Sequence, residues 1–153
     1  VSEGEAAFAT SNTNLTIKGK SIFMVSGGKK SRVFVSKDFG ATWKVYETPI
    51  AQGETMTGIF TADFYNEKLG IIAGGNYMKQ DQNWANRAIT KNGGKTWKLI
   101  AENEAFGYAS CIQFVPNSKG KQLISVGGTG MFYSDDFGKS WTKFSDDKDF
   151  FFF

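Results

Sequence analysis

Three octets of similar sequence, at residues 36–43, 90–97 and 134–141, contain potentially reactive or ligand-binding side chains at fixed intervals. Each octet reads hydroxyl, any, Asp or Asn, any, Gly, any, hydroxyl, Trp. A carboxylate or amide oxygen beside hydroxyls could bind a metal or a sugar. The same oxygens can instead accept backbone N–H groups of a tight turn, in which Gly supplies the positive φ. We expect this turn-bracing, structural role at Ser36, Asp38, Gly40, Trp43, Thr90, Asn92, Gly94, Trp97, Ser134, Asp136, Gly138 and Trp141.

A second group of candidates stands before the predicted inner strands of the repeats. Glu5, Glu54 and Tyr108 each precede or open such a strand, and Glu5 and Glu54 both follow a Gly, as at equivalent positions of successive repeats. Two carboxylates at one rim could bind a cation or do acid/base work. The alternative interpretation is that they are solvated loop charges.

An insertion at residues 76–86 carries Tyr77 and Trp84 among amide side chains. From the Gly pair to the Trp there are 22 residues in this repeat, against 15 and 13 in its neighbours. Aromatic rings among polar groups suit contact with a sugar or a protein, and long loops often carry function. The alternative is that both rings pack onto their own repeat.

The composition excludes several kinds of site. The 153 residues include no His, which removes the commonest general base and metal ligand and every Ser–His or Cys–His pair. The single Cys111 lies in an alternating segment, as expected of a core residue. A net charge of +3 with scattered lysines does not indicate nucleic acid, and no apolar run approaches the ~20 residues of a membrane span. We expect no metal, no cofactor and no catalytic residue of a known type.

The elements that must position these residues are short strands. The three Trp residues of the octets are 54 and 44 residues apart, a period typical of propeller blades. Upstream of each octet lie a strand that ends in a Gly pair and, before it, another strand, at residues 7–11 in the first repeat. Each repeat therefore reads as a four-stranded meander, and the sequence predicts an all-β protein of propeller blades with no helix.

The predicted boundaries are blades at residues 5–50, 56–103 and 107–147, with the first strand of a fourth blade at 148–153. A closed propeller has about 4–8 blades. We therefore expect the chain to be part of a larger propeller, completed by further blades or by self-association. In such a propeller the turns of the octets lie on one face. The candidates Tyr77, Trp84, Glu5, Glu54 and Tyr108 lie on the opposite face, where ligands usually bind.

The octets resemble the Asp-box, or BNR, repeat of sialidases, photosystem II assembly propellers and related secreted bacterial propellers. Their spacing and Gly-Gly strand ends are similar to a bacterial BNR-repeat group often labelled oxidoreductase, although no dinucleotide fingerprint or redox pair is visible here. The resemblance extends from about residue 5 to residue 153. It implies a propeller fold and export to the periplasm, cell surface or exterior.

A sialidase needs an arginine triad for the carboxylate of its substrate, and this chain has only Arg32 and Arg87. The hypothesis is therefore a non-catalytic, exported BNR-repeat scaffold that binds a protein or a glycan through the loops opposite the octets. The alternative is a part of a sialidase-like glycoside hydrolase or lyase, with Glu5 and Glu54 at the channel mouth and the other catalytic residues outside this chain.

Overall fold

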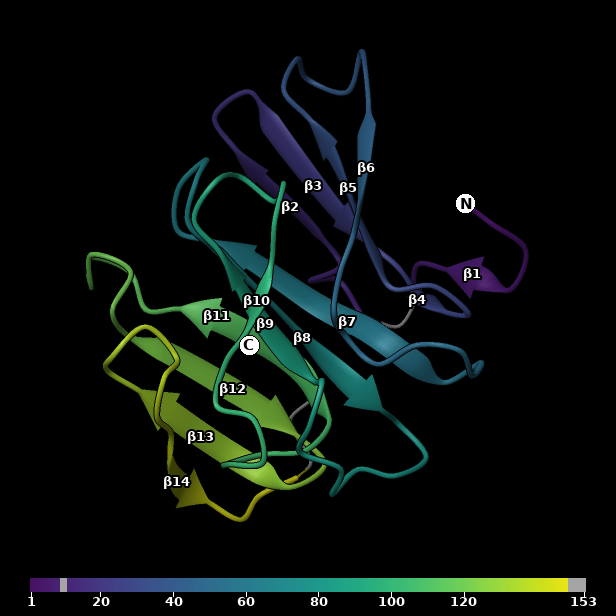
Figure 1. Ribbon diagram of the computed structural model, residues 1–153. Helices are drawn as coiled ribbons and strands as arrows, with labels where there is room; N and C mark the ends of the chain where they lie inside the picture. The colour runs from purple at the N-terminus through teal and green to yellow at the C-terminus, as the bar shows by residue number, and fades with distance from the viewer. Residues whose placement is uncertain (9–10, 149–153) are drawn as a thin grey trace.

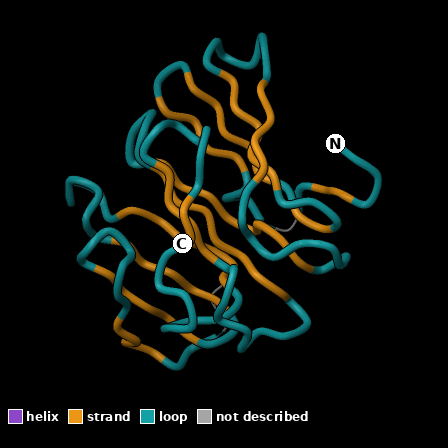
Figure 2. The backbone as a smooth tube through the Cα atoms, viewed as in Figure 1, coloured by secondary structure: helices purple, strands orange, loops and turns teal. Residues whose placement is uncertain are grey.

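The computed structural model describes residues 1–8 and 11–148, and every regular element in those residues is a β-strand (Figures 1 and 2). The strands form three antiparallel four-stranded meanders that follow one another in chain order, as propeller blades do. The predicted all-β propeller class is confirmed. The strand predicted for a fourth blade, at residues 148–153, lies outside the described residues except for Lys148, which is not in a strand.

The strands of each blade run from the inner to the outer position in sequence order. The first blade contains β2 (Leu15–Lys18), β3 (Ser21–Val25), β5 (Arg32–Ser36) and β6 (Lys44–Glu47). The second contains β7 (Thr57–Phe64), β8 (Gly70–Asn76), β9 (Arg87–Thr90) and β10 (Lys98–Leu99). The third contains β11 (Ala109–Phe114), β12 (Leu123–Gly127), β13 (Gly130–Ser134) and β14 (Thr142–Ser145). The blade boundaries named above stay predictions.

The inner strand of the first blade is not where the sequence pattern placed it. It is β2, because the two residues after it, Gly19 and Lys20, turn the chain directly into β3, and Leu15 pairs with Met24. Of the segment 7–11 predicted for this strand, residues 9 and 10 lie outside the described residues and the others are not in a strand. The short strands β1 (Glu5–Ala6) and β4 (Gly27–Gly28) pair with each other and join the second sheet where Gly27 meets Gly58.

The core lies between the blades, in two separate clusters. Successive residues of β8 serve the two sides, since Ile72 packs with Phe23 and Phe64 of one cluster while Ile71 packs with Leu123 of the other. Trp97 packs against the first cluster and Trp141 against the second. Trp97 and Trp141 therefore each fill the space between their own blade and the preceding one.

The Gly pairs at the strand ends allow two backbones to approach at a β-bulge. In the second blade a bulge falls between Ile59 and Thr61, and a Cβ placed on Gly74 would lie 2.0 Å from the carbonyl oxygen of Gly58. In the third blade a Cβ on Gly127 would lie 2.1 Å from the carbonyl oxygen of Tyr108, beside an equivalent bulge. Any side chain at these positions would push the inner strand away from its neighbour.

Side chains of β7 join the inner strands of neighbouring blades. The Thr61 hydroxyl accepts a hydrogen bond from the backbone N–H of Ile112 at 3.1 Å, and the Asp63 carboxylate accepts one from that of Phe114 at 2.8 Å. On the other side, the Thr16 hydroxyl donates to the carbonyl oxygen of Ala62 at 2.9 Å. These bonds use backbone groups of inner strand edges that would otherwise be open.

Candidate functional site

The octet turns hold their acidic residues in closed sets of hydrogen bonds. Asp38 accepts from Ser36 Oγ and Thr42 N at 2.8 Å each through Oδ1, and from Thr42 Oγ1 at 2.6 Å through Oδ2. The bonds from Thr42 lower the pKa of Asp38 below its usual range. Partial burial opposes ionisation of Asp136, but bonds from Ser140 outweigh it and the pKa of Asp136 is lowered too. These oxygens are occupied within the turn.

The middle turn keeps the same geometry with an amide. Asn92 Oδ1 accepts from Thr96 N at 3.0 Å, and its Nδ2 donates to Thr96 Oγ1 at 2.8 Å. The indole N–H of Trp97 donates to the carbonyl oxygen of Gly94 at 3.0 Å. The same bond joins Trp43 to Gly40 and Trp141 to Gly138. Each turn thus fixes the indole ring of its own Trp by the same hydrogen bond.

On the opposite rim, two of the predicted residues meet. The rings of Tyr77 and Tyr108 are 5.3 Å apart in an edge-to-face arrangement, and Phe60 lies 4.8 Å from Tyr108. Tyr77 is 38% exposed whereas Tyr108 is 6% exposed, so only Tyr77 offers a ring surface to solvent. Burial raises the pKa of the Tyr108 hydroxyl, and neighbouring Tyr77 adds to the rise. Both tyrosines line a small cavity of about 130 Å³.

The insertion that carries Tyr77 is fastened to the segment before β11. The backbone N–H of Tyr108 donates to the carbonyl oxygen of Gln80 at 2.8 Å, and Asn86 Nδ2 donates to that of Phe106 at 2.9 Å. At the start of the insertion, Asn76 Oδ1 accepts from the backbone N–H of Met78 at 2.9 Å. Trp84 is 51% exposed and lies farther along the same loop. The loop therefore presents Tyr77 and Trp84 from an ordered base.

Glu5 and Glu54 do not occupy equivalent positions of their blades, so the predicted equivalence is wrong, whereas a role for either residue in binding stays a prediction. Glu5 lies within β1 opposite Gly28, whereas Glu54 lies in the loop before β7. A loop separates β1 from β2 in the first blade, and the second blade has no such loop before β7. Glu5 and Glu54 therefore stand at different distances from the inner strands of their blades. Glu54 is exposed, and its Oε2 accepts from Asn76 Nδ2 at 3.3 Å.

Glu5 is buried and bound to its neighbours. It accepts from Ser2 N at 2.7 Å, from Ser26 Oγ at 2.6 Å and from both Nε and Nη2 of Arg32. Burial of the carboxylate opposes ionisation, but the bonds from Arg32, Ser2 and Ser26 outweigh it and lower the pKa of Glu5 to about 2. A carboxylate with that pKa and these partners cannot serve as a general acid near neutral pH.

Arg87 is a buried structural residue that the sequence pattern did not identify. Its guanidinium donates to the carbonyl oxygens of Ala101 at 2.7 Å and Phe106 at 3.1 Å, and it lies 4.1 Å from the ring centre of Phe106. Burial lowers its pKa to about 10. The only available signal was a lone Arg in an apolar strand. Arg87 fixes the segment that leads to Tyr108.

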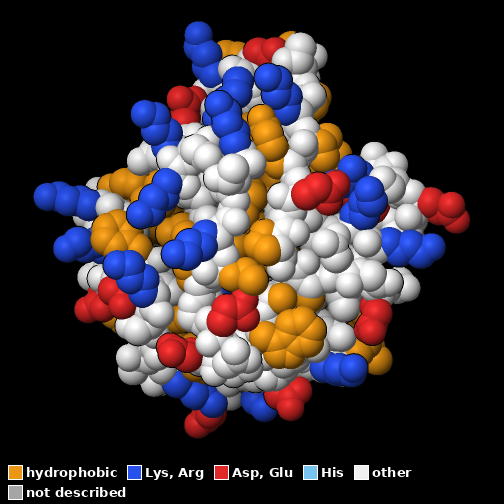
Figure 3. Space-filling view, in the orientation of Figure 1, with side chains coloured by type: hydrophobic (Ala, Val, Ile, Leu, Met, Phe, Trp, Pro, Cys, Tyr) orange, Lys and Arg blue, Asp and Glu red, His pale blue; other side chains and the backbone are white. Residues whose placement is uncertain are grey.

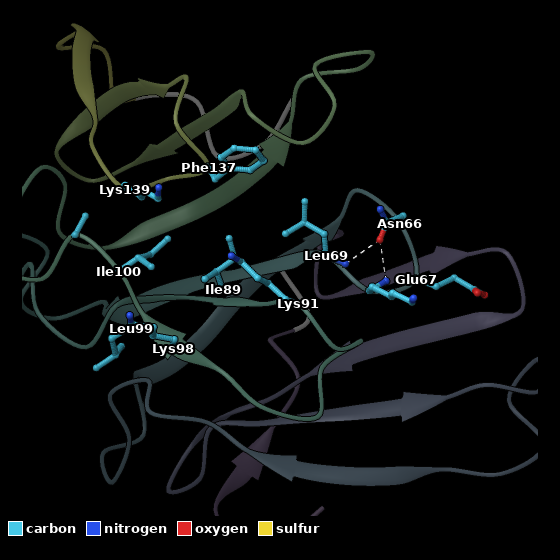
Figure 4. Close-up of a pocket in the computed structure, with 12 residues that line it drawn as sticks. Asn66, Glu67, Leu69, Ile89, Lys91, Lys98, Leu99, Ile100, Phe137 and Lys139 are labelled. Atoms are coloured by element: carbon cyan, nitrogen blue, oxygen red, sulfur yellow. Dashed lines mark hydrogen bonds between the residues drawn. The ribbon is translucent and has the colours of Figure 1, made fainter.

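A second hollow, larger than the cavity beside Tyr77 and Tyr108, lies on the other face. It has a volume of about 940 Å³ and lies between the second and third blades, beside the octet turn that contains Phe137 (Figure 4). Its residues come from the turn after β7, from β9 and the octet turn that follows it, from β10 and the two residues after it, and from the third octet turn. Because these segments are far apart in sequence, no local motif could have revealed the hollow. Within residues 1–8 and 11–148, no group of three or more His, Cys, Asp or Glu could hold a metal, and no helix could span a membrane.

Comparisons with known proteins agree with this geometry. The BNR/Asp-box repeat family model matches residues 132–143. The chain is 31% identical to the oligoxyloglucan-reducing end-specific xyloglucanase of Emericella nidulans, over 74% of this chain and 14% of that protein. It therefore spans only about a seventh of the length of that relative.

Two solved structures show the same fold at low sequence identity. The GH74 enzyme of Niastella koreensis aligns with a TM-score of 0.61 and 17% identity, over 86% of this chain and 22% of that one. YCF48 bound to D1 peptide aligns with a TM-score of 0.56 and 19% identity, over 91% of this chain and 43% of that one. In both, the part matched is a fraction of a longer chain.

Proposed function

Since this chain carries BNR/Asp-box repeats on β-propeller blades, we propose that it is a non-catalytic binding scaffold that holds a glycan or a protein at the rim opposite the octet turns. The observation that carries the proposal is the pair formed by Tyr77 and Tyr108. The half-exposed Tyr77 ring is held edge-to-face on a buried partner, on a loop with an ordered base. Export, which the resemblance implies, stays a prediction.

A glycan is the first ligand to test. A fixed, partly exposed aromatic ring with amides nearby provides an apolar face for a sugar ring and donors for its hydroxyls. The relative at 31% identity is named as an enzyme that acts on xyloglucan oligosaccharides, which makes these the natural probe. The protein alternative has support of the same kind, because YCF48 is described as bound to a peptide.

The test is calorimetric titration of the chain with xyloglucan oligosaccharides. Changing Tyr77 and Trp84 together to Ala should weaken binding by about tenfold or more, because stacking on each ring contributes about 0.5–1.5 kcal/mol. Phe39→Ala is the matched control, since Phe39 is 68% exposed but belongs to an octet turn. Full affinity in the double variant would remove the loop from the proposal.

The second candidate is a contribution to a glycoside hydrolase. It is favoured by the relationship to the xyloglucanase. Hydrolysis of a glycosidic bond normally needs two carboxyl groups about 5–9.5 Å apart, and Glu5 is engaged with Arg32. Release of reducing ends from xyloglucan by this chain, abolished by Glu54→Gln, would support the hydrolase. Binding without hydrolysis would support the scaffold.

A further inference from the structure

The hollow between the second and third blades has an apolar floor. Leu69 and Ile100 pack on the core cluster between these blades, and Ile89, Leu99 and Phe137 complete the surface (Figure 4). The floor is mainly aliphatic and contains one aromatic ring. With about 940 Å³ it is large enough for several side chains of a ligand.

The walls of the hollow are fixed by local hydrogen bonds. Asn66 Oδ1 accepts from the backbone N–H groups of Lys68 at 2.9 Å and Leu69 at 2.8 Å, which holds the turn after β7 (Figure 4). On the other side, the Phe137 backbone N–H donates to the carbonyl oxygen of Lys121 at 2.9 Å. Phe137 has a φ of 65°, a left-handed conformation that is unfavourable for a bulky residue. The hollow is therefore preformed, and its one aromatic ring is held in a strained conformation.

The rim of the hollow is cationic. Lys68, Lys91, Lys98 and Lys139 all line it and are all exposed. Among the described residues, none of these four lysines forms an ion pair. The single acidic residue of the lining, Glu67, already accepts from the Ser21 hydroxyl of the first blade at 2.9 Å. Figure 3 shows Lys and Arg side chains around hydrophobic surface on this face, over β9 and β10.

One edge of the hollow also offers backbone groups. Ile100 N donates to the carbonyl oxygen of Arg87, and Leu99 pairs with Ala88 across β9 and β10. Bonding alternates along an antiparallel pair, so the N–H and C=O of Leu99 point away from β9. β10 is the last strand of its sheet. An extended chain could add hydrogen bonds at this edge.

We propose that this hollow is a docking site for an acidic peptide segment that carries a large apolar side chain. Four separate lysines match several carboxylates better than the single charge of a fatty acid, and the aliphatic floor takes up a Leu or Phe side chain. A sugar would find only one aromatic ring, and single-stranded nucleic acid would need several for stacking. The site is on the octet face, so it does not depend on the proposed rim function.

The test is fluorescence anisotropy with the labelled peptide EDLEFD. We expect saturable binding that weakens as salt is added. The peptide EDSEGD, which keeps the charges without the apolar side chains, should bind at least tenfold more weakly. The double variant Lys91→Glu and Lys139→Glu should also bind EDLEFD at least tenfold more weakly.

The matched control is Lys29→Glu with Lys44→Glu, which changes two exposed lysines of the first blade. Both double variants change the net charge from +3 by −4, to −1, so they differ only in where the charge is changed. An equal loss of EDLEFD affinity in the two double variants, or equal affinity for the two peptides, would overturn the proposal. Displacement of labelled EDLEFD by the fatty acid laurate at a lower concentration than by unlabelled EDLEFD would also overturn it. Thermal unfolding of every variant checks that the blades remain folded.

Discussion

Four hydrogen bonds from Ser2, Ser26 and Arg32 hold the carboxylate of Glu5 at the start of the first blade. Each bond favours the ionised form, and together they lower the pKa to about 2 from an ordinary value of 4.5. A depressed acid pKa stabilises the folded state above the ordinary pKa, and this stabilisation is lost as the pH falls through the folded-state value. Glu5 therefore acts on stability rather than on a ligand.

We predict that Glu5→Gln lowers the free energy of unfolding at pH 6 and that its difference from wild type shrinks between about pH 4.5 and pH 2. Urea unfolding at a series of pH values measures this difference. Glu54→Gln is the control, because Glu54 is exposed and far less bound, and its difference from wild type should be small at every pH. A Glu5→Gln difference that does not change with pH would contradict the prediction.

Phe39 has an unfavourable backbone conformation whose effect on stability can be measured. It has a φ of 57° and is 68% exposed, so its side chain gains little from packing while its backbone is strained. Because Asn tolerates this conformation, Phe39→Asn should raise the free energy of unfolding by about 0.5–1 kcal/mol, measured by thermal or urea unfolding.

The reverse change supplies the control. Gly93 holds the matching position of the middle octet with a φ of 73°, and a Cβ there would lie 2.7 Å from the carbonyl oxygen of Glu67. Gly93→Phe should therefore destabilise the chain. A decrease in stability on Phe39→Asn would show that the exposed ring has a packing role that outweighs the strain.

At the scale of elements, the inner strands depend on polar side chains of β7. Asp63 accepts from the backbone N–H groups of Phe64 and Phe114, each at 2.8 Å, and Lys18 Nζ lies 3.8 Å from it. Burial raises its pKa despite these bonds. A raised acid pKa favours the folded state below the ordinary value, and this contribution is lost as the pH rises through the folded-state value. The change in unfolding free energy with pH that comes from Asp63 is therefore opposite in sign to the change that comes from Glu5.

We predict that Asp63→Ala speeds amide hydrogen exchange at Phe114 and in β11, because the N–H of Phe114 loses its acceptor. The unfolding free energy should fall by about 1–3 kcal/mol, the usual effect of leaving a buried donor unpaired. Asp63→Asn keeps one acceptor oxygen and should retain most of the protection. Exchange at Phe114 that is unchanged in Asp63→Ala would show that another group holds this strand.

At the scale of the whole molecule, the two end blades differ from the middle one. Trp97 and Trp141 pack against a preceding blade, but Trp43 is 43% exposed. Leu15, Ile17 and Val45 of the same blade are 46%, 58% and 44% exposed, and Phe144 of the third blade is 54% exposed. Leu15 and Ile17 lie on the same face of β2, because side chains alternate along a strand, and exposed apolar groups gathered on one face favour contact with another chain.

We therefore predict that the 153-residue chain on its own associates through these faces, with a molar mass above the 16.9 kDa of the monomer. Light scattering after size-exclusion chromatography measures the mass. Ile17→Asp should shift the mass towards the monomer, whereas Lys44→Asp, a change to an exposed lysine of the same blade, should not. A strict monomer at all concentrations would exclude self-association as the way in which the ring is completed.

The class of fold could be predicted from the amino-acid sequence, because the octets repeat with their Gly and Trp positions intact. Turn residues act locally: the oxygens of Asp38, Asn92 and Asp136 bond N–H groups within the same eight residues. The Gly pairs report a similarly local bulge. For these reasons three four-stranded units could be predicted from one chain, and the meeting of Tyr77 with Tyr108 follows from the blade topology.

The position of the first inner strand, the hydrogen-bond partners of Glu5 and the location of the large hollow could be learned only from the folded chain. The position of β2 is set by its pairing with β3. The negative charge of the Glu5 carboxylate is balanced by Arg32, which is 27 residues away in sequence. The hollow combines Asn66, Lys98 and Phe137 from three separate segments. Contacts between segments that are distant in sequence depend on how the blades pack, and no local residue pattern encodes that packing.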